Sequence, residues 1–171
     1  GDGGKPLFKQ NATTSAGTYY VSNYVYNDQM YVRNLDGSIK KTLNQVCSTC
    51  TVKEESFGLF YPAMALDSTN DIIFSDAVDN VTPTYQIGKY NLVTGGNPSG
   101  QARVMLTNAL LTTYPTALTT GKVTSSTLYA GLMNGKVLKI VNASTGAGTW
   151  SDISGTGFVG SVSDIEFGAN D

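Results

Sequence analysis

Short apolar runs separated by polar turns recur along the chain in a fixed order, and this pattern predicts β-strands. The first kind of run is small and apolar and opens a unit; its copies are 61–67, 114–119 and 162–167. The second kind is rich in β-branched and aromatic residues and ends in small or acidic ones. Its copies are 71–76 and 127–131, and the earliest copy is expected at 23–27.

The third kind of run is a strand followed by asparagine and then by a glycine turn; its copies are 31–37, 88–95 and 138–146. The asparagines Asn34, Asn91 and Asn142 fall roughly 50 to 57 residues apart. A fourth strand is expected after each turn, at 38–43, 102–106 and 149–153. Because asparagine and glycine tolerate a positive φ, we expect them to supply that conformation in these turns.

A repeat of about 50 residues with four short strands per unit is typical of a β-propeller, in which each unit is one blade. We expect an all-β fold, with one propeller segment over residues 1–171, blades at about 15–50, 57–108 and 111–156, and 158–171 opening the next blade. The first unit shows no clear opening strand, and the last consists only of one. These roughly three and a half four-stranded blades therefore need a larger ring or a second copy to complete them.

Several stretches resemble known propeller families. Residues 34–43, which read NLDGSIKKTL, are similar to the N-L-D-G-x-x-x-K-x-L stretch of the YWTD-type propellers of lipoprotein receptors. Residues 65–67 and 73–76 resemble that family's A-x-D and Y-W-T-D runs, the latter in degenerate form. The third unit, which reads YAG at 129–131, is more similar to secreted bacterial propellers of the sortilin and Asp-box type, without the Asp of that box. The resemblance implies a propeller outside the cell or at its surface.

Composition agrees with β-structure and narrows the choice of partner. Charged residues make up only 14% of the chain, and 19 glycines and 10 tyrosines take their place, which disfavours a helical bundle. The net charge is −2 and the 11 basic residues are scattered, with Lys40-Lys41 as the only adjacent pair, which argues against nucleic acid or an anionic membrane as partner. No apolar run approaches 18 residues, so no membrane span is expected. The start, GDGG, has neither Met nor a signal peptide, which favours a processed chain or a fragment.

Cys47 and Cys50 are the only cysteines, and they lie in the polar connection between the first two units. A zinc site needs four ligands, and the chain has no other cysteine and no histidine. A redox CxxC pair normally begins a helix, which is not expected here. We therefore expect a short disulfide that fixes this connection locally, in an oxidising compartment.

The absence of histidine excludes Ser-His-Asp and Cys-His mechanisms, so catalysis would have to rest on groups such as carboxylates. Asp76, Asp79, Asp164 and Glu166 are the candidates, but no sequence feature brings two of them together, and solvated or turn-forming roles are expected. Residues 67–71, which read DSTND, begin like a calcium loop but lack its central glycine and closing glutamate, so a turn is expected there. We expect no metal and no cofactor.

Asn11, Asn80 and Asn142 each begin an N-x-[ST] pattern, which makes them glycosylation sites if the source is eukaryotic and secretory. The leading functional hypothesis is a non-catalytic extracellular propeller for protein recognition or assembly, which binds a protein partner or a second copy through its open blade edges. Two alternatives stay open. One is a fragment of a secreted glycan-active enzyme, sialidase-like or of the glycoside hydrolase kind, and the other is a structural subunit of an extracellular filament. A glycan ligand is also open.

Overall fold

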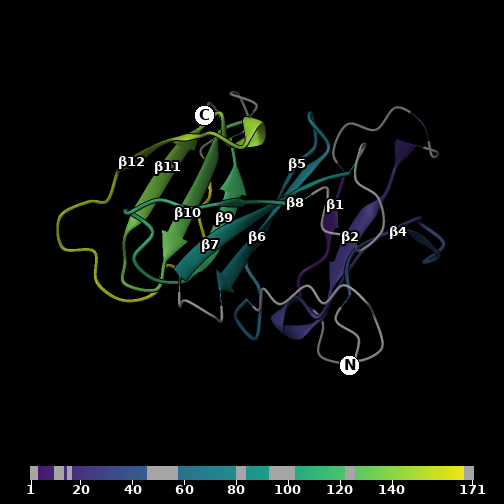
Figure 1. The fold of residues 1–171 in the computed structure, drawn as a ribbon, viewed down its shortest axis with the longest axis horizontal. Helices are drawn as coiled ribbons and strands as arrows, with labels where there is room; N and C mark the ends of the chain where they lie inside the picture. Colours follow the sequence, from purple (N-terminus) through teal and green to yellow (C-terminus); the bar gives the residue numbers. More distant parts are fainter. Residues whose placement is uncertain are drawn as a thin grey trace.

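The computed structural model describes residues 4–9, 14, 17–45, 58–79, 84–92, 103–121 and 126–167. They form three four-stranded sheets that stand side by side in Figure 1. The first sheet contains β1 (Leu7–Phe8), β2 (Tyr20–Asn23), β3 (Gln29–Arg33) and β4 (Ile39–Gln45). The second contains β5 (Met64–Asp67), β6 (Ile72–Asp79), β7 (Thr84–Asn91) and β8 (Arg103–Leu106). The third contains β9 (Pro115–Thr120), β10 (Leu128–Leu132), β11 (Val137–Val141) and β12 (Thr149–Asp152).

Each sheet is an antiparallel meander in which every strand pairs with the next strand along the chain. The pairs β3–β4, β7–β8 and β11–β12 lie on either side of the three asparagine-containing turns, as the sequence pattern predicts. The all-β fold class and the four-stranded unit are therefore confirmed. Among the described residues, no helix has the length and apolar content needed to span a bilayer.

The first sheet differs from the sequence prediction in two places. The second strand is Tyr20–Asn23 and not 23–27, because Val25–Asn27 forms a 3₁₀ turn, η2, that leads into β3. The first sheet also has an opening strand, β1, which pairs with β2 through Leu7 and Phe8. A strand of two residues is too short to show an alternating pattern, so the sequence could not reveal it.

The predicted positive φ of the turn asparagines holds at only one of the three. Asn142 has φ 58°, whereas Asn34 and Asn91 are not among the described residues with positive φ. Gly37 and Gly146 take that conformation, with φ of 87° and 86°. Glycine has no Cβ to clash there, so it carries the left-handed position at lower cost than asparagine.

The second sheet is buried on both faces because its strands alternate their side chains between two cores. Ile73 packs with Val21 and Met30 of the first sheet, and all three are fully buried. Phe74, the next residue on β6, packs instead with a cluster that includes Leu128 of the third sheet. This face-to-face stacking of sheets is the packing that a blade needs.

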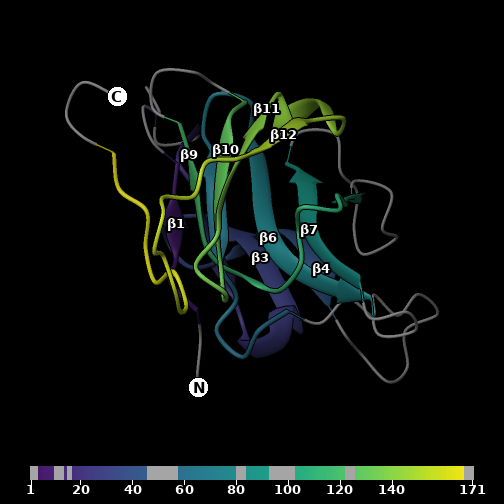
Figure 2. The same ribbon diagram turned by 90° about the vertical axis from the view of Figure 1, so that its left-hand side faces the viewer.

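The first strands of the sheets lie together and run in the same direction. One cavity of about 220 Å³ is lined by Lys5 ahead of β1, by residues 61–64 at the start of β5, by residues 116–118 of β9 and by residues 163–164. Residues further along the same strands and 164–167 line a second cavity of about 590 Å³. Figure 2 shows β1, β9 and the yellow C-terminal segment on one side of the molecule. These segments therefore surround an axis, as the innermost strands of propeller blades do.

Side-chain hydrogen bonds join neighbouring innermost segments. The hydroxyl of Thr120 donates to the carbonyl of Leu66 on β5 (3.1 Å), and the hydroxyl of Thr116 donates to the carbonyl of Val162 (2.6 Å). Residues 162–167 thus lie beside the start of β9, but they do not form a strand, and the further blade that 158–171 would open stays a prediction. No strand among the described residues pairs with them.

Candidate interaction surface

One end of the blades collects the connections that carry most of the exposed apolar side chains. In an antiparallel meander, the connection between the second and third strands lies at the same end as the segment that leads into the next blade. We call this end the loop face; it comprises residues 24–28, 58–63, 107–114, 133–136 and 153–161, and it lies toward the bottom of Figure 1. The turns between third and fourth strands lie at the opposite end.

Three aromatic side chains form a row on the loop face. The rings of Tyr26 and Phe60 meet edge to face with centroids 5.3 Å apart, and Phe60 meets Tyr61 in the same way at 4.8 Å. The exposed fractions are 43% for Tyr26, 41% for Phe60 and 64% for Tyr61. Tyr24, in the same connection as Tyr26, is also exposed. Aromatic rings that pack against one another but stay open to solvent present a rigid, partly apolar surface.

Exposed apolar groups continue onto the third blade. Met133, Ile153, Phe158 and Val159 all lie in loop-face connections, and Val159 is 89% exposed. Of the twelve large hydrophobic residues that are exposed in the described part of the chain, eight lie on the loop face. Their concentration at one end distinguishes this face from the scattered apolar residues that any protein surface carries.

The turn that presents Tyr26 is held by a buried asparagine. Tyr26 and Asn27 both have positive φ, 57° and 58°, which is unfavourable for tyrosine. The Asn27 side chain is 1% exposed, and its Nδ2 donates to the Ser75 hydroxyl (2.9 Å) and to the Asp76 carbonyl (3.0 Å). Asn44 Nδ2 in turn donates to the Asn27 carbonyl (2.6 Å). The bonds to Ser75 and Asp76 of the next blade, together with the bond from Asn44 of the same blade, offset the backbone strain and fix the turn.

Asp76 completes this buried polar cluster beneath the aromatic row. Asp76 is 1% exposed, and its Oδ2 accepts a hydrogen bond from the backbone N–H of Leu59 (2.5 Å). Burial raises the pKa of Asp76 to about 7, and the hydrogen bonds from Leu59 and Asn27 oppose that rise. A Cβ on Gly58 would lie 2.4 Å from Asp76 Oδ2, so only glycine lets the chain pass this close to the carboxyl group.

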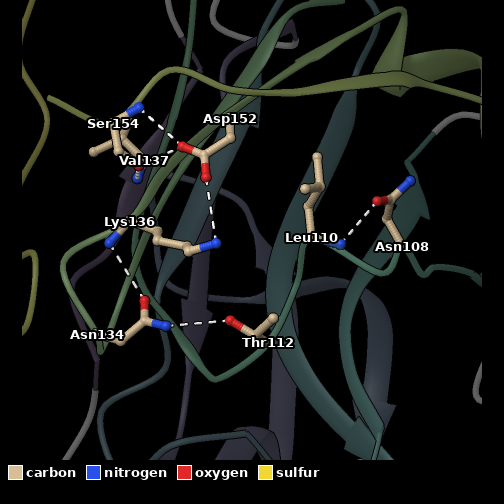
Figure 3. Close-up of polar contacts among 8 residues, drawn as sticks. All are labelled: Asn108, Leu110, Thr112, Asn134, Lys136, Val137, Asp152 and Ser154. Carbon is tan, nitrogen blue, oxygen red and sulfur yellow. Dashed lines mark hydrogen bonds and ion pairs between the residues drawn. The ribbon is translucent and has the colours of Figure 1, made fainter. Parts of the chain in front are cut away.

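Side-chain hydrogen bonds also fix the loop face of the third blade (Figure 3). Asn134 donates to the Thr112 hydroxyl (3.2 Å) and accepts from the Lys136 backbone N–H (3.3 Å). Lys136 Nζ lies 3.3 Å from Asp152 Oδ2, and Asp152 also accepts from the Ser154 hydroxyl and backbone N–H. These contacts join the β10–β11 connection to the segments before β9 and after β12. The surface is therefore ordered by its own polar groups.

The structure describes only some of the residues that the sequence singled out. Cys47, Cys50, Asn11 and Asn80 fall outside the described residues, so the disulfide and two of the glycosylation sites stay predictions. Asn142 is exposed in the turn between β11 and β12, at the end opposite the loop face. The hydroxyl of Ser144, the third residue of this pattern, donates to Asp67 (2.7 Å).

The structure places two of the candidate acids on one cavity and a third in a buried cluster. Asp76 is buried in the polar cluster, whereas Asp164 and Glu166 are exposed and line the larger axial cavity. The side chain of Asp79 lies outside the described part of the chain.

Asp67 forms a turn, as its sequence context predicts. It accepts hydrogen bonds from the backbone N–H groups of Thr69 and Asn70 and from the side chains of Asn70 and Ser144. Burial works against ionisation, but these hydrogen bonds outweigh it and hold the pKa of Asp67 below its usual range. The described residues contain no group of three or more acidic, cysteine or histidine side chains that could hold a metal ion.

Three stacked meanders around parallel first strands define the chain as a segment of a β-propeller. No protein-family model matches the chain, and no curated protein sequence matches it significantly. Among solved structures it is similar to Sqt1 of Saccharomyces cerevisiae, a propeller, with a TM-score of 0.55 and 17% sequence identity. The match covers 91% of this chain and 35% of Sqt1, so the chain spans about a third of that structure's length. At this identity the likeness shows the fold alone.

Proposed function

We propose that this chain is a non-catalytic propeller module that recognises a protein partner through its loop face. The observation that carries the proposal is the exposed row of Tyr26, Phe60 and Tyr61, which the buried polar cluster holds in place. Aromatic side chains dominate the binding energy of protein interfaces because they bury much area at a small cost in side-chain entropy. A rigid aromatic row is suited to that role.

An extracellular or cell-surface setting is part of the proposal. Its support is the low charge content, the predicted disulfide of Cys47 and Cys50, and the resemblance of residues 34–43 to the YWTD-type propellers and of the third unit to the sortilin type. Detection of free thiols by mass spectrometry on the secreted protein would test this point, since two free cysteines would contradict it.

The partner proposal is tested by crosslinking to extracellular proteins, followed by titration calorimetry with the purified candidate. The variants are Phe60→Ser and Tyr61→Ser, and the matched control is Leu35→Ser. Leu35 is 58% exposed and lies in the turn between β3 and β4, at the opposite end of the blade. We expect each loop-face variant to weaken binding by about tenfold or more, as loss of a central aromatic contact does, and the control to bind normally.

Two results would overturn the proposal. Equal affinity of the loop-face variants and the wild type would place the partner elsewhere, and equal loss in the Leu35 control would indicate a general effect on folding. Turnover of a polysaccharide by the purified chain, with release of reducing ends, would contradict the non-catalytic part.

A further inference from the structure

A third cavity, apart from the two axial cavities, lies between the first and second blades. Its volume is about 600 Å³, within the range of small-molecule sites. Its lining residues are Lys9, Gly17, Tyr19, Val32, Lys40, Lys41, Asp71 and Leu92. They come from the segment around β1 and β2, from β3 and β4, and from the two ends of the β6–β7 hairpin.

The charge of this cavity is opposite to that of the chain. Three lysines and one aspartate line it, which leaves a local excess of two positive charges, whereas the chain as a whole has a net charge of −2. Lys9 is 31 residues from Lys40 in the sequence, so the linear distribution of basic residues hides the cluster. The pairing of β1 with β2, of β2 with β3 and of β3 with β4 in one sheet brings the three lysines to one cavity.

The lysines are positioned by specific contacts. Lys9 Nζ and the Tyr19 hydroxyl both donate to Asp71 Oδ1, each at 2.5 Å. The ammonium groups of Lys9 and Lys40 lie 5.3 and 5.8 Å from the centre of the Tyr19 ring. Lys41 Nζ donates to the carbonyl of Leu92 (2.9 Å), and partial burial lowers its pKa. Each ammonium group has three N–H donors, so each retains donors for a ligand.

The rest of the wall is apolar. Val32 is 3% exposed, Leu92 packs against the adjacent core, and the Tyr19 ring is buried with it. A cavity with converging cations on one side and an aliphatic and aromatic wall on the other matches a ligand with an anionic group and a less polar body. An anion would also relieve the mutual repulsion of the ammonium groups.

We propose that this cavity binds a small organic molecule through an oxyanion group, a carboxylate, phosphate or sulfate, held by Lys9, Lys40 and Lys41. The site is separate from the loop face and does not depend on the proposed protein partner. Asp71 positions Lys9 and Tyr19, and its negative charge limits the affinity for the anion.

The test is titration calorimetry at constant ionic strength with four probes: inorganic phosphate, inorganic sulfate, glucuronate and neutral glucose. We expect saturable binding of one or more of the anions and none of glucose, and the tightest of the three identifies the oxyanion. Constant ionic strength removes the general salt effect, which would otherwise imitate weak binding.

Variants with opposite expected effects make the test specific. Lys40→Ala combined with Lys41→Ala should lower the affinity for the anion by about tenfold or more, because charge-assisted hydrogen bonds are lost. Asp71→Asn should raise the affinity for the anion several-fold, because it removes a negative charge that repels the anion. Asparagine keeps the hydrogen-bond acceptor and tolerates the φ of 52° at this position. Lys139→Ala is the control, since Lys139 also lies over a tyrosine ring, that of Tyr129, but on β11.

Three outcomes would overturn the proposal: no saturable anion binding, binding that the lysine pair does not affect, or binding that Asp71→Asn weakens as much as the lysine variant does. If the double lysine variant fails to fold, as judged by its circular dichroism spectrum, Lys9→Gln and Asp71→Asn still give opposite predictions. An equal loss in the Lys139 control would likewise assign the effect to overall charge.

Discussion

Replacement of Asp76 by asparagine should abolish a pH dependence of stability that the wild-type chain carries. Asp76 lies between the first two blades, and its buried Oδ1 has no hydrogen-bond partner among the residues that the structure describes. Asn23 Oδ1 and Asn44 Oδ1, in the same polar cluster, are also buried acceptors that receive no hydrogen bond from the described part of the chain. A proton on the Asp76 carboxyl adds a donor where the cluster lacks one, and the amide of asparagine adds one permanently.

The sign of the effect follows from the direction of the pKa. Burial raises the pKa of Asp76 to about 7 in the folded chain, against about 3.8 for an ordinary aspartate. The folded state therefore holds this proton more tightly than the unfolded state does, and stability falls as pH rises from about 4 to about 7. At 1.36 kcal/mol for each pH unit between the two values, the loss is about 4 kcal/mol at most.

The measurement is guanidinium unfolding between pH 4 and pH 8, followed by circular dichroism and by fluorescence of Trp150, the single tryptophan. Asp76→Asn and the wild type should have similar stability near pH 4. At pH 8 the variant should be more stable, by up to about 4 kcal/mol. Asp164→Asn is the control, because Asp164 is exposed.

The difference between wild type and variant isolates Asp76 from the other acids, since their contributions are common to both proteins. Curves that stay parallel from pH 4 to pH 8 would refute the reasoning. So would a variant that loses stability at every pH, because that result would mean that the fold needs the charge.

Three further substitutions test the packing between blades. Phe74→Ala should cost about 3–5 kcal/mol in the free energy of unfolding, because Phe74 is 1% exposed between the second and third sheets; a loss below about 1 kcal/mol would contradict this packing. Gly58→Ala should cost about 1–3 kcal/mol, since the added methyl meets the Asp76 carboxyl group, and the cost should be similar when Asp76→Asn is also present, because the clash is steric and the amide is about as large as the carboxyl group. Ser144→Ala removes a hydrogen bond to Asp67 and should cost about 1.5–3 kcal/mol in the free energy of unfolding at pH 7. Because the pKa of Asp67 is lowered in the folded chain, the ionised carboxylate stabilises the fold at neutral pH, and this stabilisation is lost as the pH falls below about 4. The cost of Ser144→Ala, measured by urea unfolding, should therefore diminish at low pH.

The order of strands was readable from the sequence because strands and tight turns are set by local chemistry. Runs of β-branched and aromatic residues predicted β6 and β10, and the asparagine and glycine turns predicted the hairpins β3–β4, β7–β8 and β11–β12. Steric limits on φ and the pleat of a strand depend on only a few neighbouring residues. Each strand and each turn therefore has its own local sequence pattern, and that pattern recurs about every 50 residues. The boundary of β2 and the existence of β1 were missed, because pairing with a neighbouring strand creates them.

The candidate sites depended on which blade faces meet. Asp76 looked like a turn acid, but the packing of the second blade against the first buries it and raises its pKa. Lys9 and Lys40 looked scattered, yet strand pairing places them around the Tyr19 ring. The sequence by itself determined the β-repeat and the absence of histidine chemistry. Only the tertiary structure decided where the aromatic row, the buried acid and the cationic cavity form, since burial and charge proximity arise between residues far apart in the chain.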